Sequence, residues 1–172
     1  MNATINLPQA NGTLQAYTLR EAPIFAKPRR LESRTVYAAA HVVADPLGEN
    51  CLGAPAVLDW EKTLAFRHHL WSLGLGVAEA MDTAQRGMGL DWTTTKELIR
   101  RSAADAKLTQ NPIACGAGTD QLSDGRRYPL HEIVTAYLEQ CEVIETAGAR
   151  VILMASRALA ASANHAEDYE RV

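Results

Sequence analysis

The chain has 172 residues, of which 47% are hydrophobic, and its formal net charge is −3 at pH 7. This length allows one substantial hydrophobic core and is too short for two full domains, so we expect a single globular domain. The small negative charge, without a tract rich in lysine and arginine, argues against nucleic acid as a partner, because the phosphate backbone requires a basic surface.

Membrane insertion and export are not expected either. No apolar run approaches the roughly 20 residues that a membrane span requires, and residues 1–31 lack the basic start, apolar stretch and cleavage site of a signal peptide. The three cysteines, Cys51, Cys115 and Cys141, are an odd number at unrelated spacings, which favours reduced thiols. These features predict a cytoplasmic protein.

Residues 1–33 are expected to form a β-hairpin followed by a connector. Two short β-prone runs, residues 4–7 and 13–19, flank a segment that contains Asn11-Gly12. Asn-Gly between such runs is the strongest local hairpin signal. The following residues, 21–32, hold two prolines and little periodicity, which is typical of an extended connector.

From residue 34 to residue 172 the sequence alternates between strand and helix patterns. Four apolar runs, 35–43, 77–81, 113–115 and 151–155, predict strands. Helices are predicted over 60–73, capped by Asp59; over 94–107, with a capping box from Thr94 to Glu97; and over 130–147. A last helix is predicted to begin near Asn164.

This alternation predicts an α/β fold with a parallel sheet. Four strand–helix units equal half of a (β/α)₈ barrel, which typically takes about 250 residues. The chain is therefore expected to form strands one to four of such a barrel, as a piece of a longer protein, or an open four-stranded sheet.

Polar residues follow the predicted strands, where parallel α/β folds place their active sites. The second strand leads into residues 76–89, which carry Asp82, Thr83, Gln85 and Arg86 before two glycines. His41, Asp120 and Arg157 follow the first, third and fourth strands. The sequence therefore predicts one polar site at the carboxyl ends of the strands.

Three kinds of chemistry are compatible with these residues. His41, Glu79, Asp82 and Asp120 could bind one divalent cation. Alternatively, glycines beside Arg86 and before Asp120 could present backbone N–H groups to an anion, with Arg86 or Arg157 as a two-pronged clamp. A lysine Schiff base is the third possibility, but none of the four lysines follows a strand.

Each of these residues also has a purely structural interpretation. Glu79 lies within an apolar strand, where it could pair with a buried basic residue. His41 could be a hydrogen-bonded core residue, Asp82 and Asp120 could cap turns, and Arg157 could be a solvated loop residue. Trp60, Trp71 and Tyr137 are expected in the core.

Four segments, residues 37–46, 78–87, 114–121 and 151–159, resemble a family of barrel aldolases. Over residues 35–172 the chain is similar to an uncharacterised branch, a domain of unknown function, of the dihydrodipicolinate synthase/N-acetylneuraminate lyase superfamily. Members of that branch are roughly twice as long, so the resemblance implies the amino-terminal half of the barrel.

The resemblance also implies roles for individual residues. Residues 82–85 occupy the place of a Thr-Thr-Gly-Glu turn that binds the carboxylate of a 2-oxo acid, and only Thr83 is retained in kind. The strand-four tyrosine of the family is replaced by Ser156-Arg157. The Schiff-base lysine of the family belongs to a sixth strand, which the 172 residues do not include.

The resulting hypothesis is an aldolase-like carbon–carbon lyase, without a cofactor, that acts on a small keto acid or oxidised sugar and is inactive as this half-length chain. The expected substrate-binding residues are Thr83, Gln85, Arg86, Asp120 and Arg157. One alternative is a metal-dependent sugar isomerase or epimerase, with the four cation ligands named above. Another is a non-catalytic half-barrel that functions only by assembly. Because half a barrel has two open sheet edges, we expect a homo-oligomer.

Overall fold

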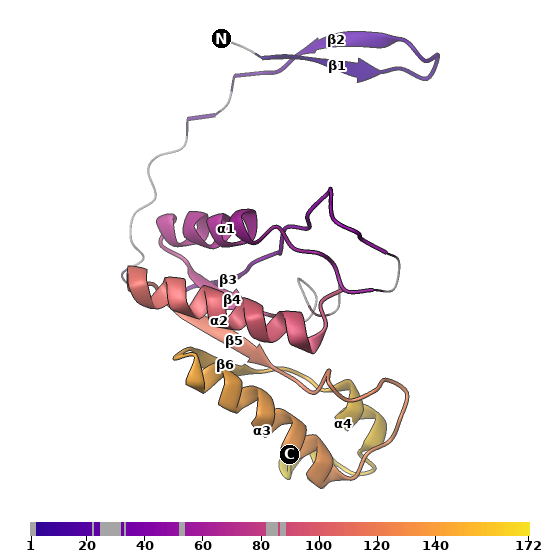
Figure 1. Ribbon diagram of the computed structural model, residues 1–172, viewed down its shortest axis with the longest axis vertical. Helices are drawn as coiled ribbons and strands as arrows, with labels where there is room; N and C mark the ends of the chain where they lie inside the picture. Colours follow the sequence, from indigo (N-terminus) through magenta and orange to yellow (C-terminus); the bar gives the residue numbers. More distant parts are fainter. Residues whose placement is uncertain are drawn as a thin grey trace.

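The computed structural model describes residues 3–21, 23–24, 32, 34–51, 54–81, 86 and 89–172. Within these residues the chain forms a two-stranded antiparallel sheet and a separate four-stranded parallel sheet with helices (Figure 1). The expected α/β class and the parallel pairing of the four strands are therefore confirmed. An open sheet and a section of a barrel both have this arrangement.

The amino-terminal hairpin consists of β1 (Thr4–Pro8) and β2 (Leu14–Thr18). The predicted hairpin is confirmed, and its register pairs Thr4 with Thr18 and Pro8 with Leu14. Gly12 has a φ of +80° at the turn, a conformation that residues with a side chain rarely adopt. Every residue of the two strands is exposed, so the hairpin contributes nothing to the hydrophobic core.

The parallel sheet has the strand order β3-β4-β5-β6, which is the order along the chain. The strands are β3 (Tyr37–Ala39), β4 (Gly76–Glu79), β5 (Ile113–Ala117) and β6 (Arg150–Leu153). The two central strands are buried along their whole length, and apart from Glu79 they consist of apolar or small residues. Strands β3 and β6 form the two edges of the described sheet.

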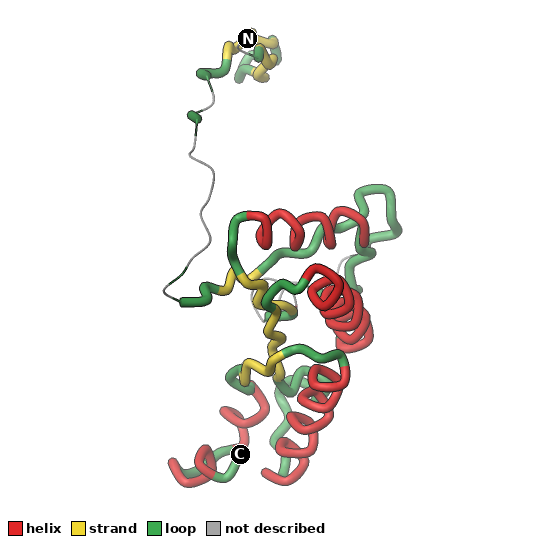
Figure 2. The backbone as a smooth tube through the Cα atoms, turned by 90° about the vertical axis from the view of Figure 1, so that its left-hand side faces the viewer, coloured by secondary structure: helices red, strands yellow, loops and turns green. Residues whose placement is uncertain are grey.

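Three helices connect the four strands: α1 (Trp60–Ser72), α2 (Trp92–Thr109) and α3 (Leu130–Thr146). Two short helices follow β6, α4 (Arg157–Ser162) and α5 (Ala166–Glu170). Figure 2 shows the sheet nearly edge-on, with α2 and α3 on one side of the strands. The successive connections therefore return over the same face of the sheet instead of alternating between two faces.

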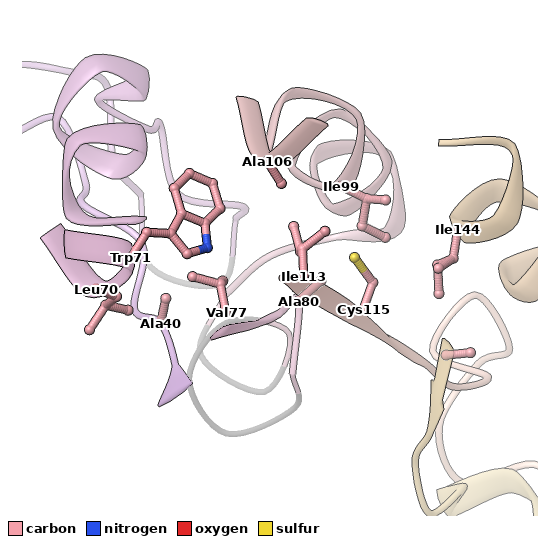
Figure 3. Packing of buried hydrophobic residues seen from close by; sticks show 11 residues of the cluster. Ala40, Leu70, Trp71, Val77, Ala80, Ile99, Ala106, Ile113, Cys115 and Ile144 are labelled. Atoms are coloured by element: carbon pink, nitrogen blue, oxygen red, sulfur yellow. The ribbon is translucent and has the colours of Figure 1, made fainter. Parts of the chain in front are cut away.

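The main core lies between that face and the helices (Figure 3). Val77 pairs in register with Ile113, and alternate residues of a strand share one face, so Cys115 lies on the same face as Ile113. The helices contribute Leu70, Trp71, Ile99, Ala106 and Ile144 to the same cluster. This packing fixes the strand ends from which the polar residues extend.

Some predicted boundaries differ from the structure. The first strand spans only three residues, not nine. Helix α2 begins at Trp92, because the side chain of Asp91 accepts a hydrogen bond from Thr94 N at 2.7 Å and caps the helix there. Asp59 caps α1 as predicted, through a 2.9 Å bond from Lys62 N. The short helix α4 was not expected.

Among the residues that the structure describes, no helix has both the length and the apolar character needed to cross a membrane. Likewise, the three cysteines form no disulfide, which agrees with the expected reduced thiols.

Candidate functional site

A pocket of about 520 Å³ lies at the carboxyl ends of β5 and β6. We call it the rim pocket. It is lined by residues 118–124, which follow β5, by residues 154–158, which follow β6, and by Arg86, Leu90, Asp91 and Trp92. This is the edge at which parallel α/β folds bind their ligands. Three of the predicted substrate-binding residues, Arg86, Asp120 and Arg157, line it together.

Arg86 is held in place at the wall of the rim pocket by contacts with three parts of the chain. Its Nη1 donates to Asp120 Oδ1 at 2.7 Å and to Gln140 Oε1 at 2.5 Å, and its Nη2 donates to the carbonyl of Gly116 at 2.5 Å. Only 2% of the Arg86 side chain is exposed. A guanidinium group with this many fixed acceptors organises the pocket wall and is poorly placed to move toward a ligand.

Gln140 of α3 is the second member of this network. Its Nε2 donates to Asp120 Oδ1 at 3.1 Å and to Gln121 Oε1 at 2.6 Å. Its Oε1 also accepts from the backbone N–H of Gly118 at 2.7 Å. That N–H is therefore used within the protein, so the glycine run after β5 does not present it to an anion.

Two glycines of β5 and its following turn fit tightly against this network. A Cβ atom at Gly116 would lie 2.7 Å from Met154 Sδ and 2.9 Å from the carbonyl oxygen of Ala80. A Cβ atom at Gly118 would lie 3.2 Å from Asp120 Oδ1. The glycines thus serve close packing between neighbouring strand ends.

Two hydroxyl groups of the pocket lining pair with each other. Thr119 Oγ1 lies 2.5 Å from Ser156 Oγ, and both residues are buried. The hydroxyl of Tyr137 donates to the carbonyl of Met154 at 2.5 Å. Burial raises the pKa of Tyr137 above its ordinary value, so this phenol stays protonated at neutral pH.

The mouth of the pocket is more polar and more exposed. Arg157 has a side chain that is 67% exposed, and its Nη1 lies 3.7 Å from Asp124 Oδ2. Asp91 contributes a second carboxylate at the start of α2. Beside it, the indole N–H of Trp92 donates to Glu139 at 2.8 Å, and the guanidinium of Arg86 lies 5.4 Å from the centre of the Trp92 ring. The described lining therefore carries two guanidinium groups and three carboxylates.

Glu79 has a structural role instead of lining the pocket. Arg67 of α1 binds it through two hydrogen bonds of 2.8 Å, and both side chains are fully buried. Arg67 also donates to the carbonyl oxygens of His41 and Thr63. This confirms the structural interpretation of Glu79, which pairs with a buried basic residue.

The metal interpretation gains no support from the described residues. None of their His, Cys, Asp and Glu side chains form a group of three or more that could hold an ion. Glu79 is engaged by Arg67, Asp120 is engaged by Arg86, and His41 is exposed and outside the rim pocket lining. The fourth expected ligand, Asp82, lies outside the described residues.

Two expected substrate-binding residues, Thr83 and Gln85, also lie outside the described residues.

Sequence reasoning did not identify two residues that support the strand ends. Arg67 of α1 binds Glu79, and Gln140 of α3 binds Arg86. A charged or amide residue at a core-facing helix position was the available signal: Gln140 lies seven residues after Ile133 and four before Ile144 in the helix predicted over 130–147. Tyr137 was assigned to the core, yet its hydroxyl supports the pocket wall.

Comparison with known proteins places the chain within a family. No curated protein matches this sequence. Residues 5–172 match the family described as "Protein of unknown function (DUF993)", and this match covers nearly the whole chain. The chain therefore belongs to the DUF993 family of proteins of unknown function.

Proposed function

We propose that this chain provides the substrate-binding half of a dihydrodipicolinate synthase-like aldolase or lyase barrel that acts on a small keto acid or oxidised sugar. The observation that carries the proposal is the rim pocket, which brings Arg86, Asp120 and Arg157 together at the carboxyl ends of two parallel strands. The consecutive strand order, with helices returning over one face, is that of successive units of such a barrel.

The proposed roles of the arginines follow from their environments. Arg157 lines the pocket at the end of β6 and its side chain is 67% exposed, and we assign its guanidinium group to the substrate carboxylate. Arg86 acts as a positioning residue, because it fixes Asp120 and the end of β5. Thr83 and Gln85 remain proposed contacts that rest on the resemblance alone.

Catalysis in this scheme requires a group that the 172 residues do not supply. The chain has four lysines, Lys27, Lys62, Lys96 and Lys107, and none follows a predicted strand. An aldolase of this kind activates its carbonyl substrate as a Schiff base on lysine. We therefore expect this chain to bind substrate without turning it over.

Calorimetric titration of the purified chain with pyruvate and with D-gluconate tests the proposal. At least one of these carboxylates is expected to bind, and Arg157→Ala is expected to weaken that binding about tenfold because it removes a charge-assisted hydrogen bond. Arg171→Ala is the matched control, since Arg171 is an exposed arginine that does not line the pocket. Absence of binding by both carboxylates at millimolar concentration would refute the proposal.

One observation favours a second candidate, a half-barrel that functions by assembly. Leu153 lies on the edge strand β6 and is 68% exposed. An open sheet edge with exposed apolar side chains favours pairing with another chain. No observation on the described residues favours the metal-dependent isomerase.

A further inference from the structure

We propose that the amino-terminal hairpin docks, by one apolar face, on the amino end of the parallel sheet of its own chain. By the amino end we mean the surface formed by residues 36, 73–75, 108–112 and 147–149, which lies opposite the rim pocket. The structure describes the hairpin undocked, because every residue of β1 and β2 is exposed. The docking does not depend on the proposed function.

One face of the hairpin is apolar. Directly paired residues, and residues two apart in a strand, share a face of a sheet. Ile5 pairs with Tyr17, and Leu7 and Leu19 lie two residues from them, so these four share one face with Gln15. The four large side chains are between 38% and 48% exposed. The opposite face carries Thr4, Asn6, Ala16 and Thr18, with Pro8 and Leu14 beside the turn.

This apolar face needs a cover for the hairpin to be stable. A single two-stranded hairpin is marginally stable at best in water, and packing of a hydrophobic face against another element stabilises it. Residues 3–19 contain no charged side chain, so covering the face removes no charge from water. The best cover for such a face is a surface that is also uncharged.

The amino end of the parallel sheet is uncharged. The segments that lead from the helices into β4, β5 and β6 are residues 73–75, 110–112 and 147–149, and none of them contains a charged residue. Because the three strands are parallel neighbours, these segments lie at the same end of the sheet. The opposite end carries the guanidinium groups and carboxylates of the rim pocket. The hairpin face therefore matches the amino end.

Apolar side chains are also exposed at this end. Val36, just before β3, is 40% exposed, and Leu108, in the last turn of α2, is 82% exposed. Pro112 is exposed as well. The carbonyls of Val36 and Pro112 accept from Gly76 N at 2.8 Å and from Val77 N at 3.0 Å, which places the two residues beside consecutive positions of β4. Covering these side chains is favourable because it removes apolar surface from water.

The chain itself tethers the hairpin to this end of the sheet. Residues 20–34 precede Val36 and β3, so the connector enters the sheet at its amino end. Fifteen residues span at most about 50 Å, whereas four strands about 4.8 Å apart are only about 15 Å across. A short tether gives an effective concentration on the order of millimolar. At micromolar protein concentration, the hairpin should therefore dock on its own sheet and not on a second copy.

Amide hydrogen exchange of the purified chain, followed by NMR, tests this docking. The reporters are the amides of Gln9 and Leu19, which donate to the carbonyls of Thr13 and Ala3, both at 2.8 Å. A hairpin without a cover opens continually, and docking should slow the exchange of both amides at least about tenfold. Because docking occurs within one chain, this protection should be the same at micromolar and at millimolar protein concentration.

Substitutions at the amino end locate the docking surface. Leu108→Asp and Val36→Asp each place a carboxylate on that surface, so each should speed the exchange of the two reporter amides about tenfold. Leu138→Asp is the matched control. Leu138 is 62% exposed but lies eight residues before the end of α3, so its substitution should leave the protection unchanged. Circular dichroism checks that each variant is folded.

Three results would overturn the inference. Fast exchange of both reporter amides in the unmodified chain would show that the hairpin does not dock. Protection that rises with protein concentration would show that a second copy covers the apolar face. Protection that survives both Leu108→Asp and Val36→Asp would show that the hairpin docks on another surface. If one of these two variants fails to fold, the other decides between the surfaces.

Discussion

At the scale of single residues, the two candidate acidic residues that the structure describes, Glu79 and Asp120, lie in different environments. Each is bound by an arginine, but Glu79 is sealed in the core whereas Asp120 keeps one oxygen at the rim pocket. The distinction depends on burial and not on residue type. An acidic residue within an apolar strand is expected to have a basic partner, because an isolated buried charge is very costly.

Removal of one member of the Arg67–Glu79 pair should be far more damaging than removal of both. Glu79→Ala leaves a buried guanidinium without its carboxylate, and we expect the free energy of unfolding to fall by about 3–5 kcal/mol. The double variant Arg67→Met/Glu79→Leu should lose less than either single variant. Urea unfolding measures each value.

Glu142→Leu provides the control for this comparison, because Glu142 is exposed on α3 and its substitution should change stability by no more than about 0.5 kcal/mol. A double variant less stable than both single variants would show that the charged pair itself is the main stabilising element.

At the scale of elements, Glu97 of α2 forms ion pairs along the helix instead of the predicted helix cap. It was predicted to close a capping box with Thr94, but Asp91 caps α2 instead. The Glu97 carboxylate binds Arg100 at 2.7 Å and Arg101 at 2.6 Å. These hydrogen bonds are the main cause that lowers the pKa of Glu97 to about 2.

The lowered pKa of Glu97 predicts a pH dependence of stability. A carboxyl group whose pKa is lower in the folded state than in the unfolded state stabilises the folded protein at pH values above the unfolded-state pKa. This stabilisation is lost as the pH falls to the folded-state pKa, which is about 2 for Glu97. Glu97→Gln should therefore lower the melting temperature slightly at pH 6, and the difference from the unmodified chain should vanish near pH 2. Thermal unfolding at both values checks this.

Glu142→Gln serves as the control, because Glu142 is exposed. Its effect on the melting temperature should be the same at pH 6 and at pH 2. If the Glu97→Gln difference were the same at pH 6 and pH 2, the ion pairs with Arg100 and Arg101 would contribute nothing to folding.

The sequence predicts elements well where local signals are strong, and it predicts long-range partners poorly. The periodic apolar positions of residues 130–147 and the Asp59 cap place α3 and α1 nearly as observed. The contact of Gln140 with Arg86 spans 54 residues, and no local pattern encodes it. Asp120 and Arg157 could be assigned to one edge of the sheet, because each directly follows a predicted strand. The hydrogen bonds among Arg86, Asp120 and Gln140 could not be predicted, because they join residues far apart in the sequence.

At the scale of the whole molecule, the described sheet has two edges, β3 and β6, that pair with no further described strand. Leu153 is exposed on β6, and Ile152 beside it is only half-buried. We therefore keep the expectation of self-association, and we place the contact at β6.

Sedimentation at micromolar concentration should show a dimer or larger assembly. Leu153→Lys should shift the population toward monomer, because a lysine on an edge strand opposes pairing. Leu138→Lys is the matched control, since Leu138 is 62% exposed on α3 and is not part of the edge strand, so its substitution should leave the assembly unchanged. A monomer in the unmodified chain would exclude assembly through this edge.

The contacts of Arg86 also bear on the order in which the molecule acquires its parts. This one side chain joins residues 30, 34 and 54 positions further along the chain. Contacts of such sequence separation form only after long loops have closed, and they are slow to form during folding. We therefore expect the rim pocket to be completed late in folding, and a ligand of the proposed kind to bind only a chain in which these long-range contacts have formed.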